Sequence, residues 1–239
     1  MTNTRNTIRA AALATIFATT TLLAATVQGE ASPSAVKLLT AKFDSREIVK
    51  IEAGDFHFLP GQNAPIHTHS APVVGYVTKG SIIYQVEGEK PQILNKGDVF
   101  YEPVGPRILR FDNLSATEEA IFIDFNLEQV GEPFIVFEKA PTEAIDRRTL
   151  PTVDLAKLSV DQVDIYETEL EQNGTMFVNY DTPTLGFVAE GVVEISIKGK
   201  ERQRIADGAT FAFPDAGTKA IITNGSSEVS AKIITFVLR

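Results

Sequence analysis

The sequence predicts an all-β protein in which one barrel-forming segment occurs twice. Residues 75–80, GYVTKG, reappear as GFVAEG at residues 186–191, an offset of 111. At the same offset turn-forming residues also coincide, and these pairs are Pro72 with Pro183, Gly97 with Gly208, Pro103 with Pro214 and Asn113 with Asn224. Because Gly, Pro and Asn meet specific backbone demands in turns, chance would not keep them in step, and we interpret the repeat as real.

Both copies consist of short β-type runs separated by turns. In the first copy, β-branched and aromatic residues alternate along SIIYQVEGEKPQILNKGDVFYEP, and turns interrupt the pattern at EGEK and NKGD. Turns interrupt the second copy at the same positions. Many short strands with regularly spaced Gly turns favour a small barrel over βαβ units. We therefore expect a first barrel at residues 36–140, a connector with one short helix at residues 141–159, and a second barrel at residues 160–239.

The N-terminus has the pattern of a secretory signal peptide. Arg5 and Arg9 precede an apolar, small-residue run over residues 10–27, and the polar stretch QGEASPSA follows. Threonines interrupt the run, which makes it a poor membrane-spanning helix. We expect a signal peptide at residues 1–31, cleaved after Gly29 or Ala31, and a mature protein that is periplasmic or secreted and free of the membrane.

Composition and missing motifs narrow the function classes. The formal net charge is −9 and the pI is about 4.9, which argues against a nucleic-acid partner because such a partner requires a basic face. The sequence contains no cysteine, which excludes a thiol nucleophile. It has no P-loop and no dinucleotide fingerprint, so we expect no nucleotide cofactor.

Two short motifs in the first copy resemble those of the cupin superfamily. The first family motif is Gly, five residues, His, one residue, His, three or four residues, Glu, six residues, Gly. Its positions here are Gly61, His67, His69, Val73 and Gly80. The second is Gly, five residues, Pro, one residue, Gly, two residues, His, three residues, Asn. Its positions here are Gly97, Pro103, Gly105, Ile108 and, one residue late, Asn113.

The resemblance implies a bicupin, meaning two tandem jelly-roll barrels in one chain. It also implies that His67 and His69 are metal ligands in the first barrel. Two of the four family ligand positions depart from the pattern, because Val73 replaces the Glu and Ile108 replaces the second-motif His. The family's activities include oxygenases, isomerases and epimerases.

Strand geometry supports a shared direction for the two histidines, since residues i and i+2 of a strand point to the same side. Paired neutral imidazoles suit Fe, Mn, Ni, Cu or Zn, but two protein donors alone would bind such an ion weakly. His57, on the expected preceding strand, is a candidate additional ligand, with a structural role as the alternative. Arg110 is a candidate substrate anchor, unless the strand turns it to solvent.

Other residues carry weaker arguments. Gln85 is left out of the site, because its neighbours Tyr84 and Val86 belong to an apolar stripe that also occurs in the second copy. Three further residues could line the site without any spacing argument, and these are Tyr76, Tyr101 and Glu102.

The second barrel cannot hold a His-ligated metal. Val178 and Tyr180 stand at the positions of His67 and His69, and the sequence contains no histidine after residue 69. We expect this barrel to pack on the first as a built-in dimer partner or to shape a pocket. A homodimer of the whole chain is also a candidate assembly.

Three functional hypotheses remain open from the sequence. The first is an exported bicupin that binds a divalent metal and acts on a small organic molecule, as a metal-dependent dioxygenase or isomerase. The second is a non-enzymatic small-ligand-binding protein whose metal site has decayed. In the third, the histidines are structural and the function lies in assembly.

Overall fold

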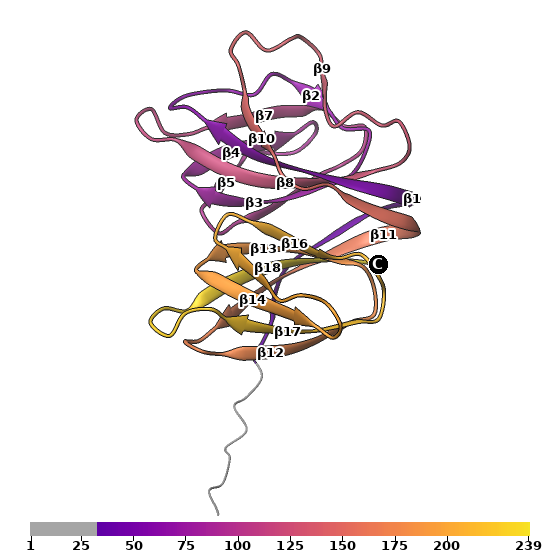
Figure 1. Cartoon of the computed structure of the whole chain (residues 1–239). Coiled ribbons are helices and arrows are strands. Elements are labelled where there is room, and N and C mark those ends of the chain that lie inside the picture. Colours follow the sequence, from indigo (N-terminus) through magenta and orange to yellow (C-terminus); the bar gives the residue numbers. More distant parts are fainter. Residues whose placement is uncertain (1–32) are drawn as a thin grey trace, which may run out of the picture. The chain divides into compact units, whose positions relative to one another are not determined.

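The computed structural model describes residues 33–239, so the predicted signal peptide lies outside the described residues. These residues form strands and no helix (Figure 1). The strands of the first half are β1 (Val36–Phe58), β2 (His67–Thr68), β3 (Val73–Lys79), β4 (Ser81–Val86), β5 (Gln92–Asn95), β6 (Val99–Glu102), β7 (Ile108–Asn113), β8 (Ala120–Glu128) and β9 (Val136–Phe137). Those of the second half are β10 (Asp146–Thr149), β11 (Val153–Leu170), β12 (Thr175–Tyr180), β13 (Thr184–Glu190), β14 (Val192–Ile197), β15 (Gln203–Ala206), β16 (Thr210–Phe213), β17 (Thr218–Asn224) and β18 (Ala231–Leu238).

The strands are arranged as two barrels that share one large sheet. The nine-stranded sheet has the order β16-β13-β18-β11-β1-β8-β3-β6, with β10 beside β1. A five-stranded sheet, β5-β4-β7-β2-β9, closes the first barrel, and a four-stranded sheet, β12-β17-β14-β15, closes the second. Figure 1 shows the indigo-to-pink half stacked on the orange-to-yellow half. The predicted all-β fold of two tandem barrels is confirmed.

Two long strands join the barrels. β1 has 23 residues and β11 has 18, and they pair antiparallel from Val36 opposite Glu167 to Ile51 opposite Val153. The other edge of β1 pairs with β8 over Lys50 to Phe58. Backbone pairing therefore extends from one barrel into the other, with three register shifts along β1 and β11, and it joins the barrels along this seam.

Equivalent residues of the two copies pack on each other where the barrels meet. Tyr76 lies against Phe187 with ring centroids 5.8 Å apart, and Phe125 lies against Phe236 at 4.7 Å. In each pair the two residues are 111 positions apart. Contact between equivalent positions defines a two-fold-like, isologous interface, so the second barrel is an internal dimer partner for the first.

The repeated asparagines make equivalent hydrogen bonds in the two barrels, which explains why they occupy equivalent positions. Asn113 Nδ2 donates to the carbonyls of Phe58, Leu59 and Glu118, and its Oδ1 accepts from the Ser115 N–H. Asn224 makes the same set of bonds in the second barrel, and its partners are Leu170, Glu171, Val229 and Ser226. Each side chain bonds four backbone groups, which is a strong constraint on a buried position.

The repeated glycines leave room for an aromatic ring. A Cβ on Gly75 would lie 2.1 Å from Cζ of Phe100, and one on Gly186 would lie 2.0 Å from Cζ of Phe211. Such contacts are far inside van der Waals distance. The first Gly of GYVTKG and of GFVAEG is therefore fixed by the phenylalanine of the neighbouring strand.

The connector contains no helix, so that part of the sequence prediction is wrong. Within residues 141–159 the structure shows β10 and the start of β11. β11 covers one edge of β1 as far as Ile51, and β10 continues along this edge from Gly54 to His57. The edge of β1 offers unpaired backbone groups there, and an added strand satisfies them where a helix could not.

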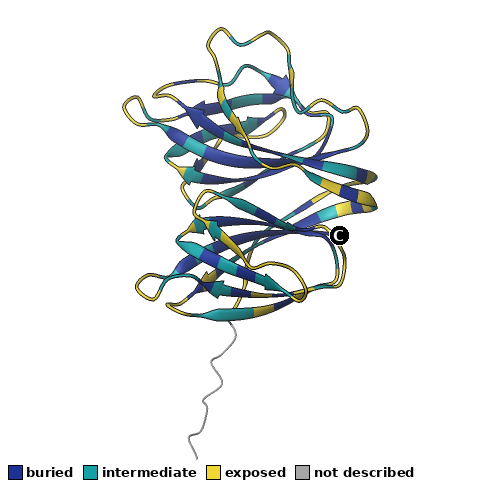
Figure 2. Cartoon of the chain, viewed as in Figure 1, coloured by how far each residue is buried: buried dark blue, intermediate teal, exposed yellow. Residues whose placement is uncertain are grey.

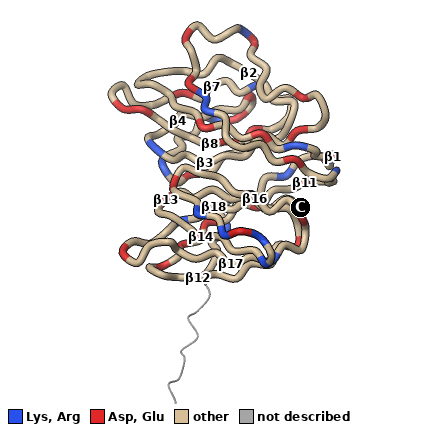
Figure 3. The backbone as a smooth tube through the Cα atoms, in the orientation of Figure 1, with Lys and Arg blue, Asp and Glu red and all other residues tan. Residues whose placement is uncertain are grey.

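Burial and charge follow the barrel architecture. Figure 2 shows the buried residues concentrated along the strands and the exposed ones in loops. Figure 3 shows acidic and basic residues side by side in both barrels, and many form ion pairs, such as Arg107 with Glu138. None of the described residues belongs to a helix that is long and apolar enough to cross a membrane.

Replacing Asn224 with Ala tests the role of the repeated asparagines. We expect the free energy of unfolding to fall by about 2–4 kcal/mol, because three carbonyls and one N–H lose their partner. Chemical denaturation monitored by circular dichroism measures the change. Asn179→Ala, at an exposed position of β12, is the matched control, and an equal loss in both variants would contradict this account.

Candidate metal centre

The pairing of β2 points two histidines into the first barrel. His67 pairs with Ile108 of β7 and with Phe137 of β9, and His69 forms an isolated bridge with Val104. Both histidines are 3% exposed, and their rings are nearly perpendicular in a T-shaped arrangement with centroids 5.1 Å apart. The His-x-His spacing therefore brings both imidazoles to one buried place, as the alternation along a strand requires.

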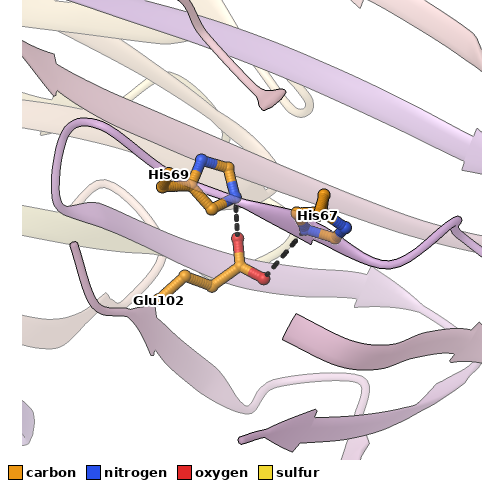
Figure 4. Close-up of side chains that lie close together, drawn as sticks. All are labelled: His67, His69 and Glu102. Atoms are coloured by element: carbon orange, nitrogen blue, oxygen red, sulfur yellow. Dashed lines mark ion pairs between the residues drawn. The ribbon is translucent and has the colours of Figure 1, made fainter. Parts of the chain in front are cut away.

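A third ligating group, Glu102, comes from β6. Its carboxylate, His67 and His69 each offer one ligand atom, and these atoms all lie within 4.8 Å of one another (Figure 4). Glu102 is 3% exposed. It is the one described residue that joins the two histidines in a cluster of this kind.

Glu102 stands directly across the strand pair from Val73. Val73 of β3 is opposite Glu102 of β6 in the antiparallel register, and side chains at opposite positions share a face of the sheet. Val73 occupies the Glu position of the first motif. The carboxylate that the motif lacks on β3 is therefore supplied from the adjacent strand.

The sequence carried a signal for Glu102 that the motif comparison missed. Phe100 and Glu102 are two residues apart on β6, and in the second copy Phe211 and Phe213 hold these positions. Alternation places both members of each pair on the buried face. A carboxylate where the other copy has a buried aromatic residue indicates a functional group.

Hydrogen bonds fix both imidazoles with Nε2 toward Glu102. His67 Nδ1 lies 2.7 Å from the Pro65 carbonyl, and His69 Nδ1 lies 3.1 Å from the Phe134 carbonyl. A carbonyl can only accept, so Nδ1 carries the proton in both rings and each Nε2 is left for another role. Such outer hydrogen bonds orient the histidine ligands of metal sites.

The Nε2 atoms approach the Glu102 carboxylate without being satisfied by it. His69 Nε2 is 3.1 Å from Oε2, and His67 Nε2 is 3.8 Å from Oε1 (Figure 4). Among the described residues, His69 Nε2 and Glu102 Oε1 are buried without a hydrogen-bond partner of acceptable geometry. Buried polar atoms normally have partners. A cation between these atoms would satisfy both.

The electrostatics of the metal-free cluster couple Glu102 to the histidines. Burial raises the pKa of Glu102, but His69 and His67 outweigh burial and the pKa falls to about 2. Burial lowers the pKa of His67, whereas the Glu102 carboxylate raises it, and the net pKa lies above the usual 6.5. The carboxylate is therefore ionised, and metal binding competes with protonation of His67.

The donor set fits a divalent transition metal. Two imidazoles and one carboxylate with open positions are typical of non-haem iron sites, and two histidines with one Glu also hold catalytic zinc. The set does not distinguish these ions by itself.

The cluster lies at the wall of a narrow, mostly aromatic cavity in the first barrel. Its volume is about 30 Å³, room for about two water molecules. The lining residues are Phe56, Phe58, Ala64, His67, His69, Glu102, Phe111, Phe122, Asp124, Ile135, Phe137 and Ile145. The segment between β8 and β10 supplies Ile135, Phe137 and Ile145 and so covers the site.

Two of the other residues considered for the site, His57 and Arg110, lie elsewhere. His57 is held between carboxylates, with Nε2 3.1 Å from Asp55 Oδ2 and Nδ1 3.0 Å from Glu119 Oε1. The structure does not bring it into the cluster of His67, His69 and Glu102. Arg110 donates to Asp112 Oδ2 at 2.7 Å, and its side chain is 43% exposed.

A β-bulge explains why Arg110 does not follow Ile108 into the barrel. Gln85 pairs with Arg110 and Val86 with Ile108, so β7 carries one extra residue at Leu109. An extra residue reverses the alternation beyond it. Ile108 and Phe111 are both buried, and Arg110 shares the outer face with Gln85.

Comparison with known proteins agrees with the fold. Residues 54–126 match the family model of the Cupin domain, and no curated protein sequence matches the chain. Among solved structures, AerE from Microcystis aeruginosa is similar with a TM-score of 0.59 and 15% identity, over 87% of this chain and 97% of that one.

Two further structures show how widely this fold is used. Salicylate 1,2-dioxygenase from Pseudaminobacter salicylatoxidans has a TM-score of 0.56 and 14% identity, over 79% of this chain and 71% of that one. Procruciferin, an 11S globulin from Brassica napus, has a TM-score of 0.57 and 9% identity, over 86% of this chain and 84% of that one. At such identities the likeness shows the fold alone, so function must be argued from the site.

Replacing Glu102 with Gln tests the third ligand. We expect affinity for a divalent metal to fall about 100-fold, because an amide is a much poorer ligand than a carboxylate. Isothermal titration with Zn²⁺ or Co²⁺ measures it, and Glu89→Gln, at an exposed position, is the control. Unchanged affinity in Glu102→Gln would remove Glu102 from the centre.

The double variant Val73→Glu, Glu102→Val moves the carboxylate back to β3. Because the two positions are directly opposite, we expect the variant to recover at least about a tenth of the metal affinity that Glu102→Val alone loses. The same titration measures it. If the double variant binds metal no more tightly than Glu102→Val does, the carboxylate cannot reach the histidines from β3.

Metal affinity is expected to fall as the pH decreases. His67 has a raised pKa and binds metal only as the neutral imidazole, so below that pKa each pH unit costs about a tenfold loss of affinity. Above it the affinity levels off. Isothermal titrations between pH 5.5 and 8.5 measure the affinity, and correction for the ionisation heat of the buffer gives the number of protons released. An affinity that does not change with pH would contradict this assignment.

Proposed function

We propose that this chain is an exported, metal-dependent enzyme, because residues 54–126 match the family model of the Cupin domain and three metal-ligating side chains are buried together in this segment. Its substrate would be a small organic molecule, and its reaction an oxygenation or an isomerisation. The observation that carries the proposal is the convergence of two oriented imidazoles and one carboxylate on one point inside the first barrel.

The free-energy cost of burying the three ligating side chains supports a functional role for them. A buried, ionised Glu102 and two buried imidazoles are expensive to keep from water. The second barrel keeps the fold without them, with Val178, Tyr180 and Phe213 at the corresponding positions. Folding therefore does not require the three ligands, and binding an ion is the use that their chemistry fits.

Different residues of the chain would hold the ion, exclude water and orient the imidazoles. His67, His69 and Glu102 would hold the ion, which would supply Lewis-acid or redox chemistry at its open positions. Phe56, Phe111 and the other aromatic residues of the cavity would exclude water and pack on an apolar part of the substrate. The carbonyls of Pro65 and Phe134 would keep the imidazoles oriented.

A non-enzymatic metal-binding cupin is the second candidate, and the size of the cavity favours it. About 30 Å³ is far below the ~300 Å³ of typical ligand pockets. A substrate larger than a few atoms would enter only if residues 129–145 moved away from the site. The enzymatic proposal therefore requires that this segment open.

Export is proposed from residues 1–31 alone. Their basic start, apolar run and small-residue exit are typical of a cleaved signal. Cell fractionation of the native host, with the mature N-terminus determined by mass spectrometry, tests the proposal. Recovery of the uncleaved chain in the cytoplasm would contradict it.

Turnover by the metal-loaded chain tests the enzymatic proposal. The chain is loaded with Fe²⁺, Mn²⁺ or Zn²⁺ and offered a panel of small phenols, enols and hydroxy acids, with oxygen uptake and product NMR as readouts. We expect turnover that needs the metal and falls at least about 100-fold in His67→Ala. Val178→Ala, at the same position of the second barrel, is the matched control. Metal binding without turnover of any compound would favour the non-enzymatic candidate.

A further inference from the structure

Strand β12 of the second barrel is an edge strand without the features that normally protect an edge. It ends the sheet order β12-β17-β14-β15 and, among the described residues, pairs on one side only, in regular register with β17 from Thr175 to Tyr180. Its sequence, TMFVNY, contains no charged residue and no proline, whereas β15 at the opposite edge carries Arg204. Charges, prolines and bulges keep native edges from pairing with another chain. A regular edge that lacks all three is therefore a site where a further strand can be added.

The open edge of β12 presents the backbone groups of Thr175, Phe177 and Asn179. The Gly174 carbonyl accepts from the Asn224 N–H at 2.8 Å, so the backbone groups at the even positions point toward β17. Because the direction of these groups alternates along an antiparallel strand, those at the odd positions point to the open side. β12 thus offers a row of N–H and C=O groups to a partner strand.

The first barrel has a strand at the corresponding edge. At the offset of 111, Ile66 corresponds to Phe177 and Thr68 to Asn179. There β9 pairs antiparallel with β2, and the Glu138 N–H donates to the Ile66 carbonyl at 3.0 Å. The repeated fold therefore accepts an added antiparallel strand at this edge. Within residues 33–239, β12 offers the equivalent groups and no strand takes them.

The side chains beside the open edge are apolar and exposed. Phe177 is 77% exposed, and Ile221, directly opposite on β17, is 39% exposed. Both line a groove of about 530 Å³ on the outer face of the sheet. β12 lies on the side of the second barrel that faces away from the first (Figure 1). Exposed apolar side chains next to unpaired backbone groups favour an interaction surface, because a partner removes both from water.

We propose that β12 is the docking site for a second copy of this chain, with the two β12 strands paired antiparallel about a two-fold axis at Phe177. In this register Phe177 lies opposite Phe177 of the second copy, and the free backbone groups of Thr175 meet those of Asn179. A register shifted by two residues would instead place Phe177 opposite Thr175 or Asn179, both of which are polar.

The edge is complementary to itself, and this favours a second copy over an unrelated partner. The two-fold register sets apolar Met176 opposite apolar Val178 on the inner face, and it brings no like charges together because β12 carries none. A self-complementary patch gives a closed, isologous dimer. The proposed dimer involves the second barrel alone, so it does not depend on whether the first barrel binds a metal.

Sedimentation of the purified chain tests the dimer. We expect the wild type to be dimeric at about 100 µM, and Phe177→Lys to raise the dissociation constant at least about tenfold, because two lysines would meet on the axis. Ile93→Lys, at an exposed position of edge strand β5, is the matched control and should behave as the wild type. A monomeric wild type, as expected if another segment or a different protein covers the edge, would overturn the proposal. Equal association of the wild type and Phe177→Lys would also overturn it.

Single cysteines test the register. The chain contains no cysteine, so one introduced cysteine can form a disulfide only between two copies. The proposed axis puts the two Cα atoms at position 177 about 5.5 Å apart, within reach of a disulfide, and those at position 179 about 14 Å apart along the strands. We therefore expect Phe177→Cys to give a covalent dimer on mild oxidation with diamide and Asn179→Cys to stay uncrosslinked. Equal crosslinking of the two variants, or none in either, would overturn the proposed pairing.

Discussion

The burial of Glu102 between two imidazoles is the constraint on which the candidate metal centre depends. An ionised carboxylate sealed from water must be matched by positive charge or by donors. Here His67 and His69 face it, but their Nδ1 atoms are engaged by the Pro65 and Phe134 carbonyls, and unsatisfied atoms remain on both sides. The loop residues that supply those carbonyls, the aromatic wall and the covering segment are all arranged around this one incomplete cluster.

The strand register explains how the centre survives the loss of a motif residue. Opposite positions on paired antiparallel strands are nearly equivalent in space, so a carboxylate can pass from Val73 on β3 to Glu102 on β6 without a change of backbone. The shared sheet and the isologous packing of Tyr76 on Phe187 hold this backbone in place. The second barrel thus supports the first as a fixed partner while its own interior carries no histidine.

The sequence was sufficient for the fold but only partly sufficient for the site. The repeat, the turn residues and the His-x-His pair each act through local geometry, which is readable from spacing. Glu102 occupies an unspecified position of the second motif, directly before Pro103, and its place beside the histidines depends on which strands pair and in which register. Arg110 was ambiguous because a bulge at Leu109 reverses the alternation, and a bulge leaves no local signal in a single sequence. The prediction of a helix in the connector was wrong because the chain there pairs with the open edge of β1. This edge exists only in the assembled sheet.

The most direct test of the account is a crystal structure of the chain soaked with a divalent transition metal, with data collected on both sides of the metal's absorption edge. The account predicts one anomalous peak in the first barrel, at about 2.0–2.2 Å from Nε2 of His67, Nε2 of His69 and a carboxylate oxygen of Glu102. A barrel without a peak, or a peak held by surface residues while these three side chains keep their metal-free contacts, would contradict it.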